Sequence, residues 1–135
     1  MALITWNENL SVNIQEFDQH HKKLIDMINN LHQAMKQGKG KDVLEDILKG
    51  LVEYTDFHFK TEEEYFKKFN YPESRQHIQE HNAFVKKVVD FVDTFKKGDL
   101  GLSIEISSFL SDWLKTHING TDKKYSTFLN DKGIV

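Results

Sequence analysis

The feature that most constrains the fold is a 3/4 spacing of apolar residues in four long stretches of the chain. The first stretch shows it in steps of four and three: Phe17, His21, Leu24, Ile28, Leu31 and Met35. Such spacing places side chains on one face of an α-helix, whereas a strand alternates every second residue. The stretches are also far longer than usual strands. The pattern therefore predicts an all-α protein.

Glycine and proline residues separate the four stretches at three places: Gly38 with Gly40, Pro72, and Gly98 with Gly101. We therefore expect four helices, at about residues 18–37, 41–68, 74–97 and 103–129. The last helix should have a break near residue 120. Short connections favour antiparallel neighbours, so the expected fold is an up-down-up-down antiparallel four-helix bundle with an N-terminal non-helical arm. Residues 1–135 are expected to form a single domain.

Charge and hydropathy exclude several classes of partner. The chain has 18 Lys and Arg against 21 Asp and Glu, with a net charge of −3. This balance gives no basic surplus for nucleic acid or anionic lipid. No run approaches the roughly 18 apolar residues of a membrane span, and the first ten residues lack the pattern of a signal peptide. We expect a cytoplasmic protein that binds neither nucleic acid nor membrane.

The chain has no cysteine but seven histidines. Disulfides, thiolate metal sites and a cysteine nucleophile are therefore excluded, and any metal must be held by nitrogen and oxygen. Polar residues also fall on the apolar stripes, where burial is costly unless they are paired or bound to metal. These candidate ligands are His21, His58, Glu62, His77, His81, His117 and Asp122.

The candidate ligands are expected to meet in one layer of the bundle. With a rise of about 1.5 Å per residue, they lie between about 20 and 30 Å from the end that carries the glycine loops. His58 with Glu62, and His77 with His81, are i,i+4 pairs that share a helix face. His117 and Asp122 are five apart, so the helix must be distorted between them, and Gly120 is a candidate for the distortion.

Five imidazoles and two carboxylates exceed the needs of one ion. Nitrogen and oxygen ligands suit iron, manganese, zinc or copper. Two six-coordinate ions offer about 12 positions, and bridging carboxylates with one shared oxo or hydroxo group leave one position open. An open position in an apolar bundle, with no obvious acid or base beside it, favours binding of a small molecule.

The pattern His21, His58-x-x-x-Glu62, His77-x-x-x-His81 and His117-x-x-x-x-Asp122 resembles the hemerythrin family. The resemblance runs from Trp6 to about Phe128, and the short cysteine-free form is similar to the bacteriohemerythrins. The family usually reads Asp-x-Gln-His-Lys on the first helix. This chain instead has His20 at the position of the glutamine, and only His21 continues the apolar stripe.

The resemblance implies two iron ions (Fe2+/Fe3+) joined by an oxo or hydroxo group and bridged by Glu62 and Asp122. It implies that His77, His81 and His117 complete one iron. His21 and His58 would hold the other, which keeps an open position for dioxygen. Apolar side chains at matching places would form the oxygen pocket: Leu24, Trp113, Leu114 and Ile118.

The expected function is reversible dioxygen binding, for storage or for delivery to an oxygen-consuming enzyme, by a monomer or weak oligomer that is not an enzyme. The alternatives are a sensor or interaction protein for oxygen or iron, and a di-iron peroxidase or oxidase. Ferritin-type iron handling is disfavoured because those bundles use Glu-rich sites. Of the remaining candidates, we expect His20 to face solvent, His32 to be structural, and Glu63 and Glu64 to lie on a solvated face.

Overall fold

The structure is a computed structural model that describes residues 4–98 and 102–135. Its helices form four long rods. The first rod is α1 (Gln15–Lys36), and the third is α4 (Ser74–Lys96). The second rod is α2 (Gly40–Tyr54), which continues through the π-helical η2 (Thr55–Phe59) into α3 (Lys60–Phe69). The fourth is α5 (Leu102–Trp113), which continues through the π-helical η3 (Leu114–Thr121) into α6 (Asp122–Asp131). No strand occurs in the described ranges.

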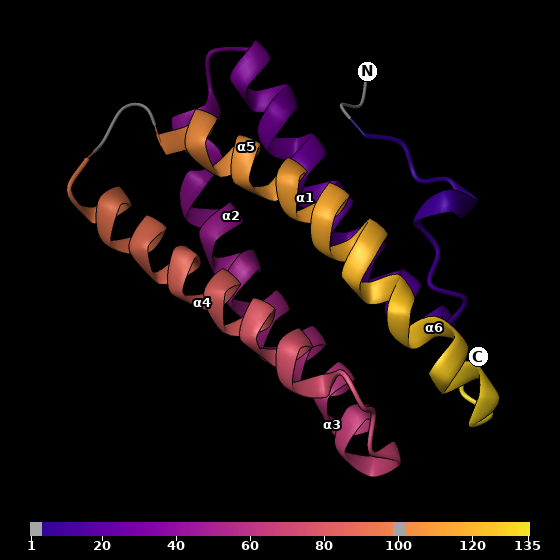
Figure 1. Cartoon of the computed structure of the whole chain (residues 1–135). Coiled ribbons are helices and arrows are strands. Elements are labelled where there is room, and N and C mark those ends of the chain that lie inside the picture. The colour runs from indigo at the N-terminus through magenta and orange to yellow at the C-terminus, as the bar shows by residue number, and fades with distance from the viewer. Residues whose placement is uncertain (1–3, 99–101) are drawn as a thin grey trace.

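The four rods lie side by side (Figure 1). Helix α1 contacts α2 and α5, and α4 contacts the same two helices. Each rod therefore neighbours the one before it in the chain, and the first neighbours the last, as in an up-down-up-down bundle. The predicted all-α four-helix bundle is confirmed. None of the described helices is both long and apolar enough to cross a membrane.

The core consists of two apolar clusters. The larger contains Leu24, Ile28, Leu51 and Leu110 among others, all buried. The smaller is formed by Val12, Ile14, Phe17, Phe66, Tyr71, Tyr125 and Leu129. Along α1, His21 stands between Phe17 of the smaller cluster and Leu24 of the larger. A polar layer therefore divides the core.

The N-terminal arm contacts both clusters. Its residues Ile4, Trp6 and Leu10 pack against the larger cluster, whereas Val12 and Ile14 belong to the smaller one. The arm contains one short 3-10 turn, η1 (Glu8–Leu10). The backbone N–H of Val12 donates to Asp18 Oδ1 (2.9 Å), and the Ser126 hydroxyl donates to the Val12 carbonyl (2.6 Å). Helix α1 begins at Gln15, three residues before the expected start and directly after the buried Ile14.

Gly50 lies within α2, where glycine costs about 1 kcal/mol relative to alanine. A Cβ atom at Gly50 would lie 2.7 Å from the sulfur of Met27 on α1. The missing side chain therefore lets α1 and α2 approach each other closely.

Candidate metal centre

All seven candidate ligands lie in the polar layer, and none is more than 2% exposed. Their ligand atoms form two groups, within each of which the atoms lie no more than 4.8 Å apart. The first group is Glu62, His77, His81, His117 and Asp122, and the second is His21, His58, Glu62 and Asp122. Glu62 and Asp122 belong to both groups.

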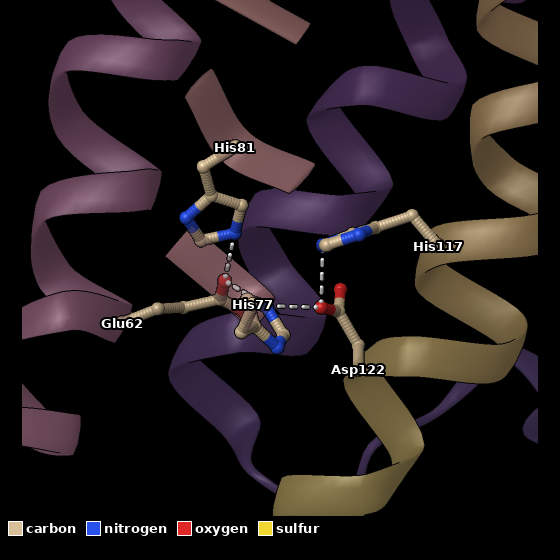
Figure 2. Close-up of side chains that lie close together, drawn as sticks. All are labelled: Glu62, His77, His81, His117 and Asp122. Carbon is tan, nitrogen blue, oxygen red and sulfur yellow. Dashed lines mark ion pairs between the residues drawn. The ribbon is translucent and has the colours of Figure 1, made fainter. Parts of the chain in front are cut away.

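The two oxygens of Asp122 face different histidines. Oδ1 lies 2.9 Å from His77 Nε2 and 2.8 Å from His117 Nε2, contacts that Figure 2 shows as dashed lines. Oδ2 instead lies 3.2 Å from His21 Nε2. The carboxylate therefore presents one oxygen to each group.

Glu62 divides its oxygens in the same way. Oε1 lies 3.1 Å from His81 Nε2 (Figure 2) and 3.4 Å from His77 Nε2. Oε2 lies 3.2 Å from His58 Nε2 and accepts a hydrogen bond from the Tyr125 hydroxyl. Two carboxylates on different helices therefore span the same two groups of imidazoles.

The donor atoms fit metal ions better than they fit one another. Within the described part of the chain, several have no hydrogen-bond partner despite their close contacts: Glu62 Oε1, both Asp122 oxygens, and Nε2 of His77, His81 and His117. Buried polar atoms without partners are rare and call for an explanation. Two donors that each lie about 2.1 Å from one ion, at right angles, are about 3 Å apart. The contacts in the layer are of that size.

The charges of the layer support cation binding. Burial lowers the pKa of His77, but its close contacts with the carboxylates of Asp122 and Glu62 outweigh burial and raise it to about 10. Burial and the charge of Glu62 oppose ionisation of Asp122, yet His117 and His21 hold its pKa below the usual range. The metal-free layer therefore keeps its carboxylates ionised and compensates them with a proton, which a bound metal would replace.

The π-helical segment η3 explains how His117 and Asp122 reach one site. Their spacing of five matches the i→i+5 repeat of a π-helix, in which residues five apart lie one above the other. The backbone N–H of Asp122 donates to the carbonyl of His117, which is such a bond. The distortion expected near Gly120 is thus a wider helical turn that starts at Leu114.

Comparison with known proteins identifies the family to which the chain belongs. The family model of the hemerythrin HHE cation binding domain matches residues 12–129. The chain belongs to the hemerythrin family. It is 34% identical to a bacteriohemerythrin of Stenotrophomonas maltophilia over 93% of this chain and 81% of that one. It is 32% identical to a bacteriohemerythrin of Methylococcus capsulatus, over 96% and 99% of the two chains.

A solved structure of wild-type hemerythrin agrees in fold, with a TM-score of 0.83 and 31% identity over 93% of this chain and 97% of that one. A structure of a hemerythrin point mutant gives a TM-score of 0.84 over 94% and 97% of the two chains. The resemblance stated from the sequence motifs is confirmed.

Two carboxylates outside the predicted set orient imidazoles of this hemerythrin family member. Glu63 Oε2 lies 2.9 Å from His81 Nδ1, and Glu80 Oε1 lies 2.9 Å from His117 Nδ1. Each pair turns the Nε2 atom of its histidine toward the layer. The prediction that Glu63 belongs to a solvated face is wrong, because its half-buried side chain reaches His81 across the helix interface. Glu64 is exposed, as expected.

His20 also departs from expectation. We expected it to face solvent, but it is only 6% exposed, and its Nδ1 atom lies 2.7 Å from Nδ1 of His58. It comes from α1 and meets His58 on η2, so the contact depends on how the two helices pack. His32, farther along α1, is half-buried.

Apolar and aromatic side chains surround the layer. Leu24, Trp113, Leu114 and Ile118 are all buried in the larger core cluster. The Trp113 ring stacks on His117 with centroids 3.9 Å apart. Tyr54, which the sequence did not single out, stacks on His58 at 4.9 Å. Each of these two imidazoles therefore has an aromatic ring packed against its face.

Proposed function

We propose that this chain binds dioxygen reversibly at a di-iron centre held by the seven buried side chains. His77, His81 and His117 would hold one iron, His21 and His58 the other, and Glu62 and Asp122 would bridge the two. The observation that carries the proposal is that each carboxylate presents one oxygen to each group of imidazoles. The family match and the bacteriohemerythrin relatives support iron as the metal.

The unequal number of imidazoles supports an open position on one iron. The first group has three histidines and the second has two, while both share the same carboxylates. Two ferrous ions, when bound, supply the electrons that dioxygen accepts on binding and returns on release. The protein fixes the number of ligands and their orientation, through the contacts of Glu63 and Glu80 with the outer nitrogens of two imidazoles.

The apolar neighbours of the layer would exclude water from the open position. We propose Leu24, Trp113, Leu114 and Ile118 as the wall of this pocket. Leu24 lies one turn after His21, and Leu114 and Ile118 flank His117 within η3. A dry, apolar site prevents side reactions of the bound dioxygen and so favours its release unchanged.

A carrier fits the site better than an enzyme does. The carboxylates next to the layer, Glu63 and Glu80, are engaged by imidazoles and are poorly placed to exchange protons with a substrate. We therefore propose oxygen storage in the cytoplasm, or delivery to an oxygen-consuming enzyme, by a monomer or weak oligomer.

The test is the optical spectrum of the iron-loaded protein. After anaerobic reduction, exposure to air should produce a charge-transfer band in the visible range, and degassing should remove it over several cycles. Zinc-loaded protein is the control and should stay colourless, because zinc has no accessible redox change. A band that never forms or never reverses contradicts the carrier function. Sustained consumption of peroxide with a reductant would indicate an oxidase or peroxidase instead.

Replacing Leu114 with tyrosine should crowd the proposed pocket. Leu114 is 4% exposed, so the larger ring has no free space and must displace its neighbours. Overpacking of this kind costs about 1–3 kcal/mol, which lowers oxygen affinity by about 5- to 150-fold if the cost falls on the bound state. Oxygen titration of the reduced iron protein measures the effect.

Leu110→Tyr is the matched control for this variant. Leu110 is buried one turn earlier, in α5, and belongs to the same cluster. Its replacement adds the same bulk and should lower the thermal midpoint without a comparable loss of oxygen affinity. Equal oxygen affinity in Leu114→Tyr and the parent chain would remove Leu114 from the pocket wall.

A further inference from the structure

His20 makes a direct contact with one of the candidate ligands. Its Nδ1 atom lies 2.7 Å from Nδ1 of His58, and the two rings are 4.9 Å apart and nearly perpendicular. Both residues are buried, at 6% and 1% exposure. At this distance one nitrogen must donate a proton and the other must accept it.

The position of His58 decides the direction of this hydrogen bond. Its other nitrogen, Nε2, lies 3.2 Å from Glu62 Oε2 and 3.2 Å from His21 Nε2. A nitrogen that binds a cation must present its lone pair, so the proton of a metal-binding His58 is on Nδ1. His20 Nδ1 is then the acceptor, and the proton of His20 is on its Nε2 atom.

The surroundings of His20 allow this arrangement. His20 and His58 line a surface groove of about 390 Å³ together with Tyr54 and Phe57. A histidine on the wall of a groove can keep its second ring nitrogen hydrated while the first serves a buried partner. His20 can therefore accept from His58 without leaving its own N–H unsatisfied.

The imidazoles of the two groups are thus supported differently. His81 and His117 contact carboxylates through their outer nitrogens, whereas His58 contacts a neutral ring. The remaining imidazole of each group, His77 in the first and His21 in the second, has no hydrogen-bond partner at Nδ1 among residues 4–98 and 102–135. The second group therefore depends on His20 for its outer support.

We propose that His20 is a positioning residue for the metal ion held by His21 and His58. It accepts the hydrogen bond from His58 Nδ1 and so keeps His58 Nε2 turned toward the ion. This inference rests on the metal centre of the proposed function, but not on oxygen binding.

The test is zinc uptake by the metal-free protein in competition with a chelator. The parent chain should take up two ions in two steps, and the second step should fill the site of His21 and His58. Replacing His20 with leucine should weaken the second step by about 10–100-fold, the usual effect of losing an outer partner, and leave the first within a few-fold. His20→Gln keeps an acceptor oxygen and should restore the second step. His32→Leu, on the same helix but away from the layer, is the control.

Nitrogen-15 NMR of the zinc-loaded parent chain provides a second readout. A scalar coupling between Nδ1 of His20 and Nδ1 of His58 passes only through a hydrogen bond, so a role in simple packing would not produce it. We expect this coupling, with the proton covalently bound to His58. Because it is measured on the unsubstituted chain, it decides the matter even if His20→Leu does not fold.

Several results would overturn the proposal. They are an unchanged second step in His20→Leu, equal weakening of both steps, failure of His20→Gln to restore uptake, or absence of the coupling. A parent chain that takes up fewer than two zinc ions would overturn the centre and this proposal together. Two normal zinc steps without reversible oxygenation of the iron protein would count against the proposed function alone.

Discussion

Replacing His58 with leucine is expected to abolish reversible oxygen binding while the bundle stays helical. His58 is one of two imidazoles of the second group, so the variant leaves that iron with one imidazole and two shared carboxylates. Loss of an outer partner alone typically costs 10–100-fold in metal affinity, and we expect loss of a direct ligand to cost at least about 100-fold. The leucine fits the apolar surroundings, because His58 already packs against Phe17 and Tyr54.

Three measurements check this prediction: iron content per chain, the visible spectrum through cycles of air and degassing, and far-ultraviolet circular dichroism. His21→Leu should behave in the same way, since His21 is the other imidazole of the group. His32→Leu should retain full oxygenation. If both ligand variants still bind oxygen reversibly, the assignment of the second group is wrong.

Removal of the metal ions should lower the thermal midpoint by at least about 15 °C. A ligand present at about 1,000 times its dissociation constant stabilises the folded state by about 4 kcal/mol per site, and two sites contribute about 8 kcal/mol. For a domain of this size, each kcal/mol shifts the midpoint by about 2–8 °C.

Calorimetric melting of the iron- or zinc-loaded protein, with and without a strong chelator, measures this difference. The control is the double variant Glu62→Gln with Asp122→Asn, which retains the size of both side chains but removes the bridging charges. Its midpoint should not respond to metal or chelator. Identical midpoints for loaded and metal-free parent protein would show that the buried layer does not hold metal under these conditions.

The features that could be predicted from sequence are periodic ones. The 3/4 spacing in α1 identified its buried face, because apolar residues on one side of a helix must be covered. His77 and His81 could be assigned to one face for the same reason, since they are four apart on α4. Counting residues from the loops was enough to place the candidate ligands at one level, because the helical rise is constant.

The side chains that contact the candidate ligands from outside could not be predicted in this way. Glu63 looked like one of several acidic residues on a solvated face, and His20 looked like a histidine near the start of a helix. Each instead contacts a histidine on a neighbouring helix. Periodicity describes one helix at a time and carries no information about which side chain a neighbouring helix brings opposite.

By itself, then, the sequence determined the number of helices, the buried face of each and the set of residues forced into the core. The hydrogen bonds of a helix join residues that are close in the sequence, and the spacing of apolar residues along that helix specifies which face must be buried. The tertiary structure decided how Glu62 and Asp122 divide their oxygens between two groups, and which residues support the imidazoles from outside. Those features depend on how the helices are rotated against one another and on the wider turn of η3, which the periodicity of a single helix does not specify.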